Sequence, residues 1–215
     1  MKHVIFVLGM LFSAGAFAQV PDSILTDVKT ICADIDSMRT KEQWQLKNEQ
    51  LTVLKEKHPD HWLTNYYAAY GAVQMTYYEG TPAEVRDMYL DMADAMLPTI
   101  EKTCPLKDEV HVLKAMIANA RLAIDPMKRN QQYSPIFEEN LKAAKAINEN
   151  NPHIYLLKGF ALYYTPKMFG GGAKAALPYF EKSKEKFALM TNRTLDVPHW
   201  GEPAAIWMIG ECTKK

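Results

Sequence analysis

Residues 151–187, NPHIYLLKGFALYYTPKMFGGGAKAALPYFEKSKEKF, contain two stretches that read as helices, joined by a glycine-rich loop. Asn151-Pro152 precedes the first stretch, and Gly170-Gly171-Gly172 leads into the second. Proline at the first position of a helix removes no helical hydrogen bond, and glycine permits the turn between two helices. We therefore predict helices over 153–164 and 173–190 that pair as a hairpin.

Proline breaks recur along the chain at a nearly constant interval. They fall at His58-Pro59, Cys104-Pro105, Asn151-Pro152 and Val197-Pro198, which are separated by 46, 47 and 46 residues. Two predicted helices fit into each interval, so the chain has the organisation of a helical repeat. Each hairpin depends on its neighbours to bury its apolar side. The prediction is an all-α chain, an α-α superhelix of about four hairpins that forms a single domain over residues 19–215.

Other start signals place the remaining helices. Thr40-Lys41-Glu42-Gln43 fits a capping box, Thr81-Pro82-Ala83-Glu84 combines a cap with proline at the first turn, and Ser134-Pro135 repeats part of that signal. Pro98 and Pro178 fall inside predicted helices and should kink or break them. The further predicted helices are 23–38, 41–57, 62–79, 82–102, 107–124, 135–149 and 203–212.

The composition narrows the class of protein. The chain has 215 residues, with 25 basic against 25 acidic side chains and 48% hydrophobic residues. The balanced charge disfavours a nucleic-acid binder, and the hydrophobic content indicates a globular protein rather than a disordered one.

The first eighteen residues have the pattern of a Sec signal peptide. Lys2 precedes an apolar run, and Ala16-Phe17-Ala18 ends it with small residues at the cleavage positions. We predict a signal peptide over 1–18, cleavage after Ala18, a periplasmic or secreted protein, and no membrane insertion. The alternative is an N-terminal helix that stays attached. Cys32, Cys104 and Cys212 lack a C-x-x-C spacing, so we expect buried small side chains, with one disulfide as the alternative.

Part of the chain resembles a known family. Asn151 to Gly159 followed by Ala173 to Phe187 resembles a tetratricopeptide repeat, and Tyr163 to Gly172 together with Pro198-His199-Trp200-Gly201-Glu202 strengthens the likeness. The chain is similar to exported tetratricopeptide-like proteins of the Bacteroidota. The resemblance implies stacked helical hairpins and says little about activity. Ordinary tetratricopeptide repeats have a period of about 34 residues, so longer helices or connections are implied here.

Aromatic residues at helical spacing form the strongest binding candidate. Trp62, Tyr66, Tyr70 and Tyr77 share one face of a predicted first helix, and first helices usually line the concave surface of a helical repeat. On the next first helix, Asn119 and Arg121 add polar groups, and Arg121 could bind a carboxylate with both guanidinium nitrogens. Core packing of the aromatic residues and a solvated surface position for Arg121 are the alternatives.

Two further sets of residues carry weaker signals. Gly170, Gly171 and Gly172 precede a helix whose free backbone N–H groups could hold an anion, although a simple turn with a close helix crossing is the preferred interpretation. His58, His61, His153 and His199 occupy related repeat positions, and we expect local contacts there rather than a metal site. The sequence contains no G-x-S-x-G, S-x-x-K or H-E-x-x-H motif.

These features favour an exported binding protein that is not an enzyme. The predicted function is recognition of a protein segment in the concave groove, with no cofactor, metal or nucleic acid. The alternative is a transport-associated periplasmic subunit that handles a small ligand together with a solute-binding protein. That alternative rests on the Phe169-Gly170-Gly171 loop, which is similar to one in helical-repeat subunits of such transporters.

Overall fold

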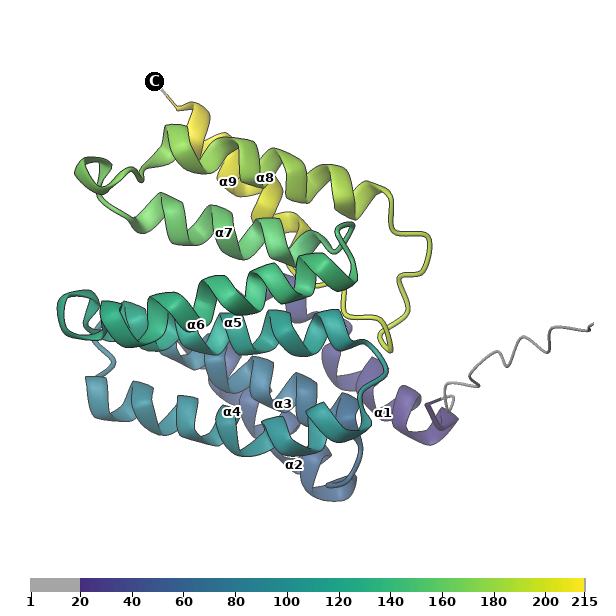
Figure 1. Ribbon diagram of the computed structural model, residues 1–215. Coiled ribbons are helices and arrows are strands. Elements are labelled where there is room, and N and C mark those ends of the chain that lie inside the picture. Colours follow the sequence, from purple (N-terminus) through teal and green to yellow (C-terminus); the bar gives the residue numbers. More distant parts are fainter. Residues whose placement is uncertain (1–19, 215) are drawn as a thin grey trace, which may run out of the picture.

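The computed structural model describes residues 20–214, and this part of the chain is predominantly helical and contains no strand (Figure 1). The predicted all-α class is therefore confirmed. The α-helices of the described part are α1 (Asp22–Cys32), α2 (Lys41–Lys57), α3 (Trp62–Gln74), α4 (Ala83–Thr103), α5 (Lys107–Ile124), α6 (Pro126–Ile147), α7 (Pro152–Tyr164), α8 (Ala173–Ala188) and α9 (Glu202–Thr213).

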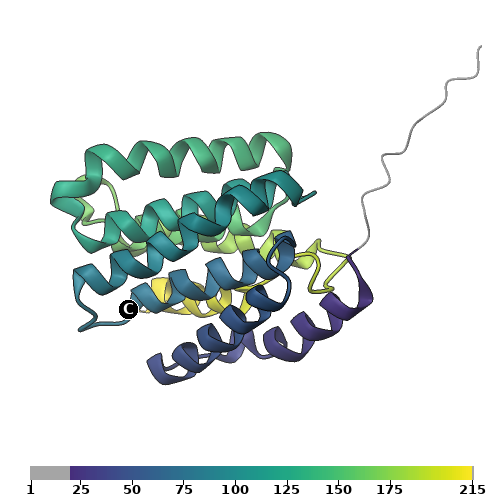
Figure 2. The ribbon, with the colours of Figure 1, turned by 90° about the horizontal axis from the view of Figure 1, so that it is seen from below.

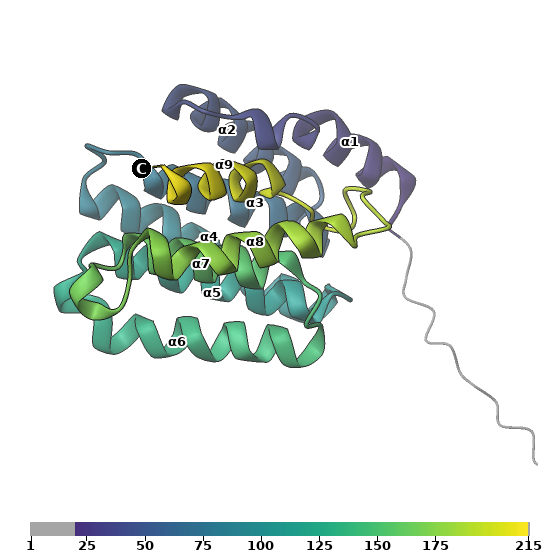
Figure 3. The same cartoon turned by 90° about the horizontal axis from the view of Figure 1, so that it is seen from above.

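The 46- and 47-residue intervals each hold two helices, as the spacing of the prolines predicts. The antiparallel pairs are α3 with α4, α5 with α6, and α7 with α8, while α9 packs against α8 (Figures 1 and 3). The arrangement of these pairs as a tetratricopeptide superhelix remains a prediction.

The pairing creates two different ends of the molecule. The junctions at Pro59, Pro105, Pro152 and Pro198 gather at one end, on the right in Figure 1, which we call the proline end. The turns from α3 to α4, α5 to α6 and α7 to α8 gather at the opposite end, on the left, which we call the turn end. Viewed from below, the same helices run between these two ends (Figure 2).

Local capping explains several helix starts. Thr40 and Gln43 form the predicted capping box at the start of α2, because the Thr40 hydroxyl accepts from the Gln43 N–H and the Gln43 side chain accepts from the Thr40 N–H. At α7, the Asn151 side chain accepts from the His153 N–H, with Pro152 in the first turn. Side-chain caps therefore set the starts of these two helices.

Three local predictions differ from the structure. Helix α6 starts at Pro126 rather than at Pro135, because the Asp125 side chain caps it by accepting from the Lys128 N–H. At α4 the Thr81 hydroxyl caps nothing, so the predicted signal there is not used. Helices α4 and α8 continue through Pro98 and Pro178, so neither proline breaks its helix.

Helix α3 lies at the centre of the core. All of its residues from 62 to 73 are buried, and α1, α2, α4 and α5 all contact it. The buried apolar side chains of the described residues form one continuous cluster. Cys32 and Cys104 belong to it as free thiols, and burial raises the pKa of each to about 12, so both stay protonated. This agrees with their predicted role as small apolar side chains.

No helix within residues 20–214 is long and apolar enough to span a membrane. The predicted signal peptide, residues 1–18, lies outside the described part of the chain.

Candidate functional site

A buried polar network joins three helices at the proline end. Its centre is the Glu109 carboxylate of α5, which accepts from the Tyr66 hydroxyl of α3 at 2.7 Å and from the Asn151 amide at the start of α7 at 2.5 Å. The His153 ring also contacts Glu109, with 2.8 Å between Nδ1 and Oε1. Glu109 and its three partners are all at least 96% buried. A buried carboxylate is stable only with such partners, so the network fixes the relative position of these helices.

The loop before α9 closes this network. His153 Nε2 lies 3.0 Å from the Trp200 carbonyl oxygen, and the Trp200 indole N–H donates to the Tyr66 hydroxyl at 3.0 Å. The His153 and Trp200 rings also stack, with centroids 3.9 Å apart, and Trp200 packs on Tyr70. Both ring nitrogens of His153 therefore face an oxygen atom, and these two contacts hold the ring in place.

The proline end therefore has a structural role. His153 and Trp200, which follow successive proline breaks, meet there and join neighbouring hairpins. A nearby cleft of about 280 Å³ is lined in part by asparagines, and several of its polar groups bond within the protein. Lys186 donates to Asn150, and Asn148 donates to Asp108.

Three of the predicted groove aromatics lie in the core. Trp62 is 4%, Tyr66 0% and Tyr70 5% exposed, so core packing, the alternative stated above, describes all three. Tyr77, in the 3₁₀ turn Met75–Tyr77 that follows α3, differs because 43% of it is exposed. The four aromatic residues predicted to share one helix face are therefore split, with three in the core and Tyr77 at the turn end.

The two polar candidates on α5 are half-buried, and Arg121 is already paired. Its guanidinium donates to Asp91 and Asp94 of α4, each at 2.6 Å, and to Asp87 at 3.3 Å. Arg129 of α6 binds the Asp87 carboxylate with both terminal nitrogens, and these hydrogen bonds hold the pKa of Asp87 below its usual value. Arg121 thus pairs with carboxylates of its own chain, and its predicted contact with a ligand carboxylate stays a prediction. Asn119 is only partly exposed.

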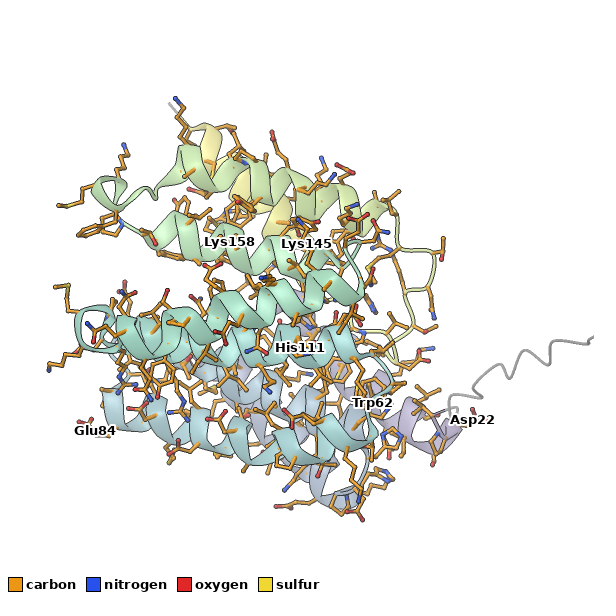
Figure 4. All side chains as sticks on the ribbon, viewed as in Figure 1. Asp22, Trp62, Glu84, His111, Lys145 and Lys158 are labelled. Carbon is orange, nitrogen blue, oxygen red and sulfur yellow. The ribbon has the colours of Figure 1, made fainter. Side chains whose placement is uncertain are left out.

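Exposed aromatic and apolar side chains gather at the turn end. Tyr164 at the end of α7 is 73% exposed, and Met168 and Phe169 in the following 3₁₀ turn, Lys167–Phe169, are 83% and 69% exposed. We call these three residues and Tyr77 the turn-end surface. Exposed apolar groups of this size in one region indicate a binding surface. Figure 4 labels Glu84 at this end and Trp62 near the other, and so marks how far apart the two ends are.

The glycine loop fixes the position of this surface. Gly170 and Gly172 have φ values of 83° and 93°, and the Gly172 N–H donates to the Leu162 carbonyl at 2.8 Å. A Cβ on Gly171 would lie 2.1 Å from the Thr165 carbonyl oxygen, so only glycine fits there. These contacts fold the loop onto the end of α7. The anion site at Gly170, Gly171 and Gly172 stays a prediction.

Electrostatic contacts link the two sides of the turn end. Although 43% of Tyr77 is exposed, desolvation of its hydroxyl raises the pKa of the residue, the nearby Arg86 guanidinium opposes this shift, and the Tyr164 phenol adds to it. Tyr77 is therefore within electrostatic range of a cation on α4 and of a phenol on α7. The sequence analysis did not select Arg86, Tyr164 or Phe169, because exposure at the end of a helix has no periodic signature.

The described histidines lie outside the turn-end surface. His58, His61, His153 and His199 belong to the proline end, and His111 on α5 contacts Asn140 on α6. Within residues 20–214, no cluster of three His, Cys, Asp or Glu side chains could hold a metal ion.

Comparison with known proteins gives one informative likeness. No protein-family model and no curated protein matches the sequence. The chain is similar to the solved structure of the HusA haemophore from Porphyromonas gingivalis, a member of the Bacteroidota, with a TM-score of 0.71 and 29% sequence identity. The match covers 94% of this chain and 97% of that chain. The two proteins therefore share their fold over nearly their whole length.

This likeness corrects the predicted function. A haemophore binds haem, a small molecule, so the predicted recognition of a protein segment in a groove is wrong. The alternative, a transport-associated subunit that acts with a solute-binding protein, is wrong for the same reason. A haemophore is a binding protein rather than an enzyme, which agrees with the prediction that this chain is not an enzyme.

Proposed function

We propose that this protein binds haem and holds it on the turn-end surface. The observation that carries the proposal is the likeness to a haemophore at 29% identity over 94% of the chain. Similarity of fold alone would not argue for a shared ligand. The exposed aromatic residues supply the second, local argument.

The chemistry of the turn-end surface suits a porphyrin. Haem has a broad apolar ring and two carboxylates, so its site needs aromatic or aliphatic contacts together with a few cations. Tyr77, Tyr164, Met168 and Phe169 offer the first kind of contact. Arg86 at the start of α4, and Lys167 and Lys174 beside the glycine loop, offer the second. Among the described residues, none of these three cations has an ion-pair partner within 4.0 Å.

The same surface limits how iron could be bound. Histidine is the commonest haem ligand in many proteins, but tyrosine and methionine also serve. Among the described residues of the turn-end surface, the candidates are the phenols of Tyr77 and Tyr164 and the thioether of Met168. Because none of these candidates is a histidine, the proposed binding depends mainly on contacts with the porphyrin ring rather than on a bond from histidine to iron.

Export is part of the proposal. A protein that captures haem outside the cytoplasm needs a signal for export, and the pattern at residues 1–18, with cleavage after Ala18, supplies one. The mature protein would then be the single helical domain over 19–215, in the periplasm or secreted.

A titration of haem into the mature protein tests the proposal. We expect saturable binding, seen as a shift and rise of the Soret absorbance at one haem per chain. The double variant Tyr164→Ser/Phe169→Ser should weaken binding about tenfold or more, because two large apolar contacts are lost. Its melting temperature should stay near that of the wild type, since both side chains are exposed.

The matched control removes two exposed apolar side chains from the other end. Ile147→Ser/Leu189→Ser changes residues that are 53% and 58% exposed at the proline end. This control should bind haem as the wild type does. An equal loss of affinity in both double variants would reject the turn-end site, and a wild type without saturable binding would reject haem binding altogether.

A further inference from the structure

Arg86 is an unpaired cation in a region where the other arginines are paired. Arg121 and Arg129 bind Asp87, Asp91 and Asp94 across α4, α5 and α6. Arg86 lies next to Asp87 in sequence, yet within residues 20–214 no carboxylate lies within 4.0 Å of its guanidinium. Carboxylates of the chain itself therefore pair with Arg121 and Arg129 but not with Arg86.

The local geometry leaves Arg86 with unmet hydrogen-bonding capacity. It follows the first turn of α4, where its backbone N–H donates to the Pro82 carbonyl at 3.0 Å. Its Nε atom is buried and has no acceptor among the described residues, and the buried Thr81 hydroxyl is likewise unpartnered. A buried donor without an acceptor destabilises the protein. An acceptor from a bound molecule would remove that cost.

The surroundings of Arg86 indicate which kind of molecule supplies the acceptor. Helix α4, which carries Arg86, packs against the 3₁₀ turn Met75–Tyr77, and Arg86 is close enough to Tyr77 to affect the pKa of its phenol. A cation beside exposed aromatic rings is complementary to a flat apolar molecule that carries a carboxylate. Guanidinium also matches the planar geometry of a carboxylate better than an ammonium does.

We propose that Arg86 binds a propionate carboxylate of haem while the porphyrin ring lies against Tyr77 and Tyr164. This assignment rests on the proposed haem binding and adds the residue that orients the ligand. It makes Arg86 a specificity-determining residue, because a porphyrin without a free carboxylate cannot use it.

Haem and its dimethyl ester separate this role from a general effect on the fold. The ester keeps the ring and the iron but has no carboxylates. We expect Arg86→Gln to lower the affinity for haem about tenfold, as loss of a charge-assisted hydrogen bond predicts, and to change the affinity for the ester less than about twofold. Arg86→Lys keeps the charge without the planar fork, so its affinity for haem should lie between those of the wild type and Arg86→Gln.

The matched control is Lys128→Gln, which removes one cation from an 86% exposed side chain at the same end. It should bind both compounds as the wild type does. Equal losses for haem and ester in the Arg86 variants, or unchanged haem binding in Arg86→Gln, would overturn the assignment. A wild type that binds neither compound would instead overturn the proposed function.

Discussion

The proline end and the turn end are built from the same helices, yet they treat polar and apolar side chains in opposite ways. At the proline end, Glu109, His153 and Tyr66 are buried and bonded to one another. At the turn end, Tyr164 and Phe169 are exposed without a partner helix to cover them. The comparison separates residues that hold the helices together from residues available to a ligand.

The loop from α8 to α9 causes this difference. It places Trp200 against His153 and Tyr70 and covers the starts of α3 and α7. The Gly201 N–H also donates to the Asp36 carboxylate at 2.8 Å, which ties the loop to the N-terminal part of the chain. The opposite ends of α3 and α7 have no such cover in the described chain. One loop therefore makes one end of the molecule a core and leaves the other as a surface.

Glu109→Ala should disrupt the buried network at the proline end and cause the largest loss of stability. It leaves the buried Tyr66 hydroxyl and His153 ring without their Glu109 contact, and the Asn151 amide keeps only its hydrogen bond to Asp108. The free energy of unfolding should therefore fall by about 3–5 kcal/mol. Thermal unfolding followed by circular dichroism should show the melting temperature falling by roughly 10 °C.

An exposed ion pair provides the control for this variant. Glu138→Ala removes the partner of Lys158 at the surface, with an expected loss below about 1 kcal/mol. If the two variants had similar stability, the buried network would not be what holds the proline end together.

Replacing tyrosine by phenylalanine at Tyr66 and at Tyr77 compares how much a hydroxyl contributes to stability at each end. Tyr66→Phe removes a hydroxyl that donates to Glu109 and accepts from Trp200, so we expect a loss of about 1–3 kcal/mol in urea unfolding. Tyr77→Phe removes a hydroxyl from a 43% exposed side chain, and the expected change is within about 0.5 kcal/mol. A larger loss at Tyr77 than at Tyr66 would contradict the division between the two ends.

The smallest expected effect concerns pH. Burial raises the pKa of Asp36 above the ordinary value for an aspartate, and the hydrogen bond from the Gly201 N–H opposes this shift. As pH rises from about 4 to about 7, the unfolded chain ionises Asp36 before the folded chain does, so this residue lowers stability over that range. Asp36→Asn keeps an oxygen for the Gly201 N–H and removes the charge. Its stability relative to the wild type should therefore increase from about pH 4 to about pH 7, and a decrease would show that the folded protein favours the carboxylate.

Local signals in the sequence predicted much of the helical structure. The predicted ranges 41–57 and 107–124 match α2 and α5 residue for residue. Helix α6 was placed too late because Asp125-Pro126 and Ser134-Pro135 have the same start pattern, and only the first is used as a cap. Proline inside a helix also proved compatible with continuity at Pro98 and Pro178.

The site residues were harder to predict because burial depends on distant parts of the chain. Tyr66 and Tyr77 have the same helical phase, but Trp200, 134 residues after Tyr66, covers only the first of them. Arg121 was a sound candidate for binding a carboxylate, and only the packing of α4 beside α5 shows that Asp91 and Asp94 already occupy it. Arg86 became a candidate because the structure leaves its Nε without an acceptor.

The sequence by itself determined the all-α class, the pairing of helices and the period of the proline breaks, because capping, proline geometry and apolar spacing act within a few residues. The tertiary structure alone decided which end is closed and which side chains remain exposed. Those properties arise when residues far apart in sequence, such as Glu109, His153 and Trp200, exclude water from one end of the helices and leave Tyr77 and Tyr164 uncovered at the other.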